Sequence, residues 1–130
     1  MKILVIDDDQ AMTELLTLLL KPATSSVIAA HSGPQGVELA KTEKPDLITL
    51  DLMMPEMSGW EVCKAIRLFS SAPILILSAL DSPGMVAAAL DAGADDYMIK
   101  PVTSSSLMAH INRLVRRTAF SNGMAYVASV

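Results

Sequence analysis

Five short apolar segments recur along this chain, and none of them alternates apolar with polar residues. Strands with that pattern are buried on both faces, as they are in the interior of a parallel sheet. Between them lie segments whose apolar residues recur at three- and four-residue spacing, which is typical of amphipathic helices. The predicted strands cover residues 3–6, 27–30, 47–50, 74–77 and 97–99.

The intervening segments predict five helices, near residues 10–21, 33–43, 58–69, 83–92 and 104–117. Two helices carry start signals. Ser58 with Glu61 has the pattern of a capping box, and Ser82 followed by Pro83 supplies an N-cap residue and a proline at the first helical position. Strands and helices that alternate in this way predict an α/β fold, a doubly wound parallel sheet with helices on both faces.

The length of 130 residues and the apolar fraction of 52% predict one compact domain with a well-filled core. Residues 1–117 carry the alternating pattern without a repeat or a linker, and we assign the domain to them. Residues 118–130 lose the helical periodicity and carry little charge. They are either a tail or the start of a linker to an absent output domain.

Charge and composition exclude several classes of protein. Fourteen acidic residues against ten basic ones give a net charge of −4, which disfavours nucleic-acid binding through this segment. No apolar run approaches the roughly 20 residues that span a bilayer, and the acids that follow Ile6 interrupt what a secretory signal requires. The single cysteine, Cys63, fits a reducing compartment. We therefore expect a cytoplasmic protein that does not associate with membranes.

Polar residues follow four of the five predicted strands. They are Asp7, Asp8 and Asp9 after the first strand, Asp51 after the third, Ser78 after the fourth and Lys100 after the fifth. Because the carboxyl ends of parallel strands meet at one edge of the sheet, we expect these side chains to lie close together. Each has an ordinary structural explanation when taken alone, and Asp9 fits a helix N-cap. Three carboxylates gathered at one edge repel one another, however, and need a cation or raised pKa values.

A hard divalent cation meets that need. Carboxylates, backbone carbonyls and water are the ligands that Mg²⁺ prefers, and the sequence has no cysteine pair and no HExxH spacing that would indicate zinc. Lys100 then supplies a charge suited to phosphate, and Ser78 supplies a hydroxyl donor. The set predicts phosphoryl transfer with Asp51 as the nucleophile.

These residues resemble the receiver domain of bacterial two-component response regulators. The resemblance covers residues 1 to about 117 and is carried by the segments ILVIDDD, LDLMMPEMSGWEVCKAIR, PILILSA and AGADDYMIKP, in order and correctly spaced. The fold that it implies is a flavodoxin-like sheet of five parallel strands in the order 2-1-3-4-5, with five helices.

The resemblance implies that Asp51 is the phosphoacceptor and takes a phosphoryl group from a sensor histidine kinase in a Mg²⁺-dependent reaction. Asp8 would bind the metal directly, and Asp7 would help largely through water. Asp51 itself and the backbone carbonyl of Met53 would complete the protein ligands.

The resemblance also assigns the residues around the phosphoryl group. Lys100 would neutralise one phosphoryl oxygen, and Ser78 would hydrogen-bond to another. The motion of Ser78 would draw in Tyr97, the switch aromatic. The family more often has threonine at the position of Ser78, but serine keeps the hydroxyl. Gly59 matches the loop after the acceptor and would permit a tight backbone approach.

The surface formed by the fourth helix, the fifth strand and the fifth helix departs from the family pattern. In receivers attached to winged-helix DNA-binding domains, this surface forms dimers through charged pairs. The two acids at 95–96 are present, whereas Val86 and Ala88 stand where their basic partners are expected. On the fifth helix, Ser106 and His110 replace the usual acid and arginine. We therefore expect a less polar homodimer or a different protein partner at this face.

Two positions set the lifetime of the aspartyl phosphate in this family. They are Met53 and the residue two past Ser78, which is Leu80. Both side chains are bulky and apolar, so neither orients an attacking water. The sequence predicts slow self-dephosphorylation.

The leading interpretation is a phosphorylation-switched signalling module that promotes only its own phosphorylation and dephosphorylation, and is not otherwise an enzyme. The alternative is a degenerate receiver that acts as a phosphorylation-independent protein-interaction module. A phosphatase of the haloacid-dehalogenase type needs a second acid where Met53 stands. A flavodoxin needs a hydroxyl-rich phosphate loop where this chain has acids.

Overall fold

The five apolar segments form one parallel sheet in a computed structural model, which describes residues 1–121. The strands are β1 (Lys2–Ile6), β2 (Ser26–Ala30), β3 (Leu47–Leu50), β4 (Ile74–Ser78) and β5 (Asp96–Ile99). Each strand lies within one residue of its predicted bounds. Their order is β2-β1-β3-β4-β5, which confirms the expected topology. The strand order reverses between β1 and β3, so a ligand site is expected outside their carboxyl ends.

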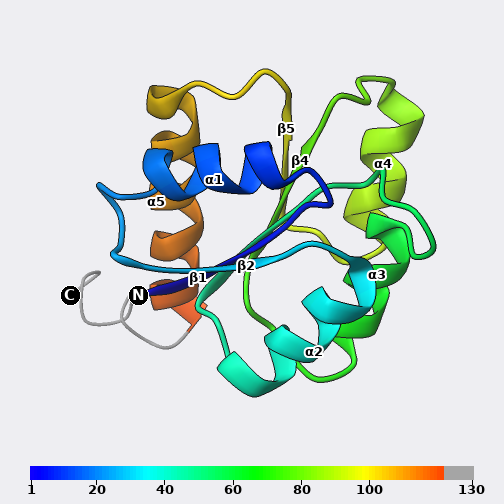
Figure 1. Ribbon diagram of the computed structural model, residues 1–130, viewed down its shortest axis with the longest axis horizontal. Helices are drawn as coiled ribbons and strands as arrows, with labels where there is room; N and C mark the ends of the chain where they lie inside the picture. Colours follow the sequence, from blue (N-terminus) through cyan, green and yellow to red (C-terminus); the bar gives the residue numbers. More distant parts are fainter. Residues whose placement is uncertain (122–130) are drawn as a thin grey trace.

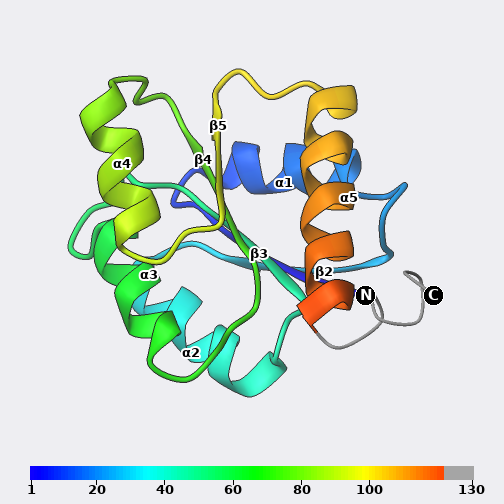
Figure 2. The ribbon, with the colours of Figure 1, turned by 180° about the vertical axis from the view of Figure 1, so that it is seen from behind.

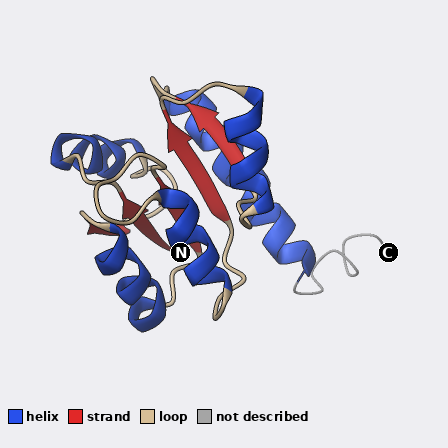
Figure 3. Cartoon of the chain, turned by 90° about the vertical axis from the view of Figure 1, so that its right-hand side faces the viewer, coloured by secondary structure: helices blue, strands red, loops and turns tan. Residues whose placement is uncertain are grey.

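Five helices connect the strands and cover both faces of the sheet (Figures 1 and 2). They are α1 (Gln10–Leu19), α2 (Gly33–Glu43), α3 (Gly59–Arg67), α4 (Pro83–Asp91) and α5 (Ser104–Ser121). Helices α1 and α5 lie on one face, and α2, α3 and α4 lie on the other. Seen from the side, the strands lie between these two layers of helices (Figure 3).

The sheet divides the core into two apolar layers. Ile3 and Val5 of β1 pack toward α1 and α5, whereas Leu4 and Ile6 of the same strand pack toward α2, α3 and α4. Both sets of side chains are buried. The absence of polar alternation in the strands therefore follows from burial on both faces. Within the described residues, no helix has the length and apolar character needed to cross a bilayer.

Side-chain caps determine where the helices begin. Asp9, Ser32, Ser58 and Ser82 each accept a hydrogen bond from the backbone N–H three residues later. The predicted caps at Asp9, Ser58 and Ser82 are confirmed. In the expected capping box, the Glu61 N–H donates to Ser58 Oγ at 3.3 Å, and the Ser58 hydroxyl donates to the Glu61 carboxylate at 3.3 Å.

The last helix is longer than the sequence pattern indicates. The predicted end is residue 117, whereas α5 continues to Ser121. Residues 118–121 contain neither glycine nor proline, the residues that most strongly disfavour a helix. The next glycine along the chain is Gly123, so nothing in residues 118–121 breaks the helix. Residues 122–130 of the predicted tail or linker lie outside the described residues, and the assignment of the domain to residues 1–117 stays a prediction.

Candidate functional site

Three acids and a lysine meet at the carboxyl-terminal edge of the sheet. Asp7, Asp8 and Asp51 each offer a carboxylate oxygen, and these oxygens lie within 4.8 Å of one another. Lys100 Nζ lies 3.1 Å from Asp7 Oδ2 and 3.7 Å from Asp51 Oδ2. The expectation that the polar residues after the strands lie close together is confirmed for these four side chains.

The strand register explains this arrangement. β1 and β3 are neighbours with Ile6 opposite Leu50, so the next residues, Asp7 and Asp51, leave the sheet side by side. The Asp51 N–H still donates to the Ile6 carbonyl at 3.0 Å, which fixes the backbone of the acid. The Lys100 N–H donates to the carbonyl of the last β4 residue at 2.9 Å, which fixes the lysine at the same edge.

The site carries more negative than positive charge, and part of the negative charge is buried. Asp7 and Asp51 are buried, and Asp8 is exposed. Burial raises the pKa of the Asp51 carboxyl; the Lys100 ammonium opposes that rise, and the negative charge of Asp7 adds to it. One lysine thus faces two buried carboxylates. An additional cation would neutralise the remaining charge.

The donor set fits Mg²⁺, since every donor is an oxygen and the exposed Asp8 leaves room for water ligands. Asp7 Oδ1 accepts the Asp9 N–H at 2.9 Å, and Asp7 Oδ2 accepts from Lys100. Because each of its oxygens already accepts a hydrogen bond, Asp7 suits a metal contact made through water. The Met53 N–H donates to Asp51 Oδ1 at 3.4 Å, so the chain turns beside Asp51. The Met53 carbonyl as a ligand stays a prediction.

Ser78 and Tyr97 are joined through one backbone segment. The side chain of Ser78 is fully buried, and its Oγ accepts the Leu80 N–H at 3.2 Å. The Tyr97 hydroxyl donates to the Leu80 carbonyl at 2.6 Å. Sequence reasoning considered Leu80 only for the bulk of its side chain. No sequence signal shows that its backbone bonds to both residues, because that depends on the path of the loop after β4.

Gly59 lies against the backbone of Asp51 and Leu52. Its N–H donates to the Leu52 carbonyl at 2.9 Å. A Cβ at Gly59 would lie 2.3 Å from the Asp51 carbonyl oxygen and 2.6 Å from Leu52 Cα. The expected tight backbone approach is confirmed.

The two acids near the start of β5 are bound within the chain. Asp96 accepts hydrogen bonds from His110 Nδ1 at 2.5 Å and from Arg113. Asp95 accepts from Arg67 at 2.7 Å. Burial acts to raise the pKa of Asp96, but the hydrogen bonds from His110, the backbone and Arg113 outweigh it and lower that pKa. Sequence reasoning missed these pairs, whose members are 14 to 28 residues apart.

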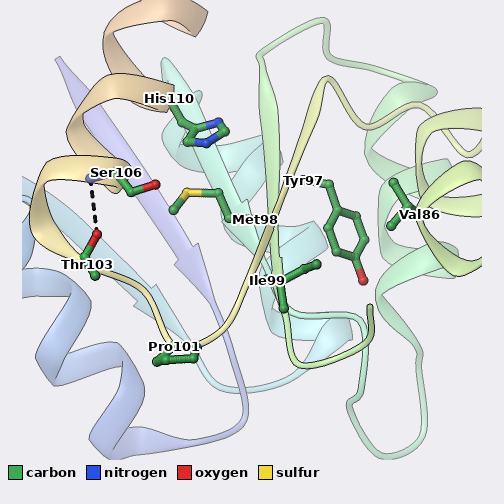
Figure 4. A pocket seen from close by; sticks show the side chains of 8 residues that line it. All are labelled: Val86, Tyr97, Met98, Ile99, Pro101, Thr103, Ser106 and His110. Carbon is green, nitrogen blue, oxygen red and sulfur yellow. Dashed lines mark hydrogen bonds between the residues drawn. The ribbon is translucent and has the colours of Figure 1, made fainter. Parts of the chain in front are cut away.

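A pocket of about 480 Å³ opens between α4, β5 and α5 (Figure 4). Tyr97 points toward Val86 of α4, whereas Met98 points toward α5. The lining is mainly apolar and also includes Ile99, Pro101, Thr103, Ser106 and His110. The only acid of β5, Asp96, does not line this pocket. The face therefore offers apolar contacts in place of the charged pairs of the family pattern.

In metal-free buffer at neutral pH, Asp51→Asn is expected to be more stable than the parent protein by about 1–2 kcal/mol. The reason is that burial of the Asp51 carboxylate disfavours its charged form; the Lys100 ammonium offsets part of this cost, and the negative charge of Asp7 adds to it. The substitution removes one of the two charges and keeps the shape of the side chain.

The gain should depend on pH. The folded-state pKa of Asp51 is raised above the ordinary value of 3.8, so the folded protein binds this proton more tightly than the unfolded chain. The stability of the parent protein therefore falls as the pH rises from 3.8 through the folded-state pKa of Asp51. The stability advantage of Asp51→Asn reaches its full size only above that folded-state pKa. Urea denaturation in EDTA across this range measures the effect. A variant that is less stable than the parent at neutral pH would contradict it.

Comparison with known proteins gives consistent matches. The family model for the response regulator receiver domain matches residues 3–112. Response regulator MprA of Mycobacterium avium (strain 104) is 44% identical over 119 residues, covering 91% of this chain and 52% of the relative. The protein of the same name from Mycobacterium ulcerans (strain Agy99) is 42% identical over 125 residues, covering 95% and 54%. The chain thus spans about half the length of the curated relatives that it matches.

Solved structures agree in fold. The receiver domain of the Francisella response regulator 1452 superposes with a TM-score of 0.83 at 33% identity, covering 90% of this chain and 98% of that one. A two-component response regulator from Clostridium difficile superposes with a TM-score of 0.86 at 31% identity, covering 90% and 97%.

Proposed function

Because this chain belongs to the response regulator receiver domains, and so to two-component signalling, we propose that Asp51 accepts a phosphoryl group from a histidine of a sensor kinase. The observation that carries the proposal is the meeting of Asp51 with two further acids and Lys100 at one edge of the sheet.

The proposed transfer needs a carboxylate nucleophile and charge neutralisation. An oxygen of Asp51 attacks phosphorus, the bond from phosphorus to the histidine nitrogen breaks, and the imidazole keeps the electron pair and takes a proton. Lys100 pairs with a phosphoryl oxygen. Mg²⁺ held by Asp8, Asp7, Asp51 and the Met53 carbonyl supplies further positive charge when bound. The domain promotes its own phosphorylation and hydrolysis and turns over no other substrate.

We propose that Leu80 carries the signal from Asp51 to the surface formed by α4, β5 and α5, which we call the output face. Its N–H donates to Ser78 Oγ, and its carbonyl accepts from the Tyr97 hydroxyl. When the Ser78 hydroxyl turns to donate to a phosphoryl oxygen, the hydrogen bond from the Leu80 N–H is altered, and the same backbone segment repositions Tyr97 in the pocket beside α4.

Intact mass after incubation with acetyl phosphate tests the proposed function. With Mg²⁺ present, we expect the parent protein to gain the mass of one phosphoryl group, whereas Asp51→Asn gains none. The same incubation in EDTA should leave both masses unchanged. A gain that persists in the variant would place the acceptor elsewhere. No gain under any condition, including incubation with a phosphorylated kinase, would favour the alternative, a phosphorylation-independent interaction module.

Met53→Asn is expected to speed hydrolysis of the aspartyl phosphate. The side chain of Met53 is 60% exposed and lies two residues after the acceptor, so a polar group there can hold a water beside the phosphoryl group. We expect a gain on the order of tenfold, below the usual contribution of a positioned general base. Loss of the phosphorylated mass with time measures it. Leu18→Asn, an exposed apolar position on α1, is the control. Equal rates in the parent and Met53→Asn would contradict the prediction.

The output face is proposed to act through apolar contacts, either in a homodimer or with another protein. Asp95 and Asp96 are already paired within the chain, and the pocket beside them has a mainly apolar lining. We expect any phosphorylation-dependent dimer to persist at high salt, because apolar association is not screened. Sedimentation at low and high salt measures this. A strict monomer at high protein concentration would exclude the homodimer and leave only binding to another protein. Nucleic-acid binding through this segment is not expected, and the proposed location is the cytoplasm.

A further inference from the structure

A second pocket lies at the opposite edge of the sheet from Asp51. Helices α2 and α3 run back along the sheet, and their carboxyl-terminal ends lie together at that edge (Figures 1 and 2). The pocket between them has a volume of about 350 Å³ and is lined by Ala40, Lys41, Lys44, Pro45, Phe69 and Ser70. None of these residues belongs to the phosphoacceptor site.

Aromatic and apolar side chains are exposed in and beside this pocket. Phe69 is 40% exposed, and the adjacent Leu68 is 89% exposed. The Lys41 ammonium lies 5.3 Å from the centroid of the Phe69 ring, a cation–π contact that holds ring and charge together. Leu68 lies outside the lining, so the apolar surface continues beyond the pocket.

The two lysines of the pocket have no acidic partner. Among the side chains that the structure describes, no carboxylate lies within 4.0 Å of the ammonium of Lys41 or Lys44. The acid between them in sequence, Glu43, pairs instead with Lys2 at 3.7 Å. In a chain with a net charge of −4, two unpaired cations therefore flank an exposed aromatic ring.

Local backbone requirements do not explain this group of residues. The end of α2 favours cations in general, but that effect does not account for the exposed Phe69 and Leu68. Lys44 has a φ of 47°, in the left-handed region, and precedes Pro45. Glycine adopts that conformation at lower cost than lysine, so the lysine side chain is not required by the turn.

We propose that this pocket, the Lys41–Lys44–Phe69 pocket, binds an acidic segment of a partner protein. One apolar side chain of the segment contacts Phe69, and flanking carboxylates pair with Lys41 and Lys44. The volume is at the lower end for a ligand pocket. Since the exposed apolar surface continues to Leu68, an extended peptide covers more of it than a compact anion does.

The experiment is a titration of the full chain, labelled with ¹⁵N, with an end-capped peptide of alternating glutamate and leucine. We expect saturable shifts confined to the amide signals of residues 40–44 and 68–70. Lys41→Gln and Lys44→Gly should each weaken binding at least fivefold. Lys21→Gln, which removes the same charge at an exposed position in the turn after α1, should change it less than twofold. Lys44→Gly also relieves the left-handed backbone, so a loss of binding there is not a loss of folding.

Three matched probes decide the outcome. A peptide of alternating lysine and leucine should not bind, and its binding would overturn the proposal. Inorganic phosphate should not saturate the same signals; if it did, the pocket would bind an adventitious ion only, and the proposal would also be overturned. Shifts that appear on concentrating the protein without peptide would identify a second copy as the occupant and also overturn it. Asp51→Asn should bind the peptide as the parent does, so this result is independent of whether the phosphoacceptor proposal holds.

Discussion

Arg67→Ala is expected to lower the free energy of unfolding by about 3 kcal/mol, which is the usual cost of breaking a largely buried ion pair that also carries hydrogen bonds. The Arg67 guanidinium donates to the Asp95 carboxylate at 2.7 Å and to three backbone carbonyls. Those carbonyls belong to Gly93, Ser70 and Ala72, in the connections before β5 and β4.

The consequence extends beyond one ion pair. Asp95 Oδ2 also accepts the Ile74 N–H at 2.8 Å at the start of β4. Without Arg67, the carboxylate would keep this contact but lose its main countercharge in a half-buried setting. The α3–β4 and α4–β5 connections would lose the side chain that joins them. We therefore expect the loss to appear as global destabilisation, since the two connections lead into the interior strand β4 and its neighbour β5.

Urea denaturation measures this loss, with two controls. Arg67→Lys keeps the charge but not the planar set of donors, and should recover less than half of the stability. Lys64→Ala, an exposed position one turn earlier on α3, should change stability by less than about 0.5 kcal/mol. If Arg67→Ala and Lys64→Ala had equal effects, the network around Arg67 would not contribute to folding.

The strands and the cluster of Asp7, Asp51 and Lys100 could be predicted from sequence because they depend on local patterns. The apolar run Leu47–Leu50 is a strand by composition, and Asp51 follows it directly. In a parallel sheet, such a residue has one edge available to it, so the meeting of Asp51 with Asp7 follows from topology alone. Gly59 could be assigned to a close approach because it matches the receiver-domain pattern after Asp51; it is the first residue of α3.

The other features depend on contacts between distant segments. Arg67 and Asp95 are 28 residues apart, and nothing in either local sequence identifies the other as its partner. Phe69 and Lys41 meet only because α2 and α3 end at the same edge. Arg113 lies in the middle of α5, where neighbouring basic residues indicate solvent, yet it pairs with Asp96. These contacts are set by helix packing, which hydrophobic periodicity does not specify to the level of individual side chains.

Gly59→Ala is expected to reduce both stability and phosphorylation. The added methyl would lie 2.3 Å from the Asp51 carbonyl oxygen and 2.6 Å from Leu52 Cα, and both of these are backbone atoms that cannot rotate away. Helix α3 must therefore move away from the acceptor loop. We expect a loss of about 3 kcal/mol, at the upper end for overpacking, which is roughly 10 °C in melting temperature for a domain of this size.

Gly84→Ala is the matched control, because a Cβ at that exposed position on α4 meets nothing within 4 Å. It should stabilise the protein by about 0.4–1 kcal/mol through the unfolded chain. Phosphorylation of Gly59→Ala, measured at a temperature where circular dichroism shows it folded, should slow at least about tenfold, since displacement of a reacting group by 1 Å costs up to roughly a hundredfold. A variant that lost stability but kept its phosphorylation rate would show that the loop positions Asp51 without support from α3. Because the clash is with the acceptor's own carbonyl, we expect the two losses to occur together.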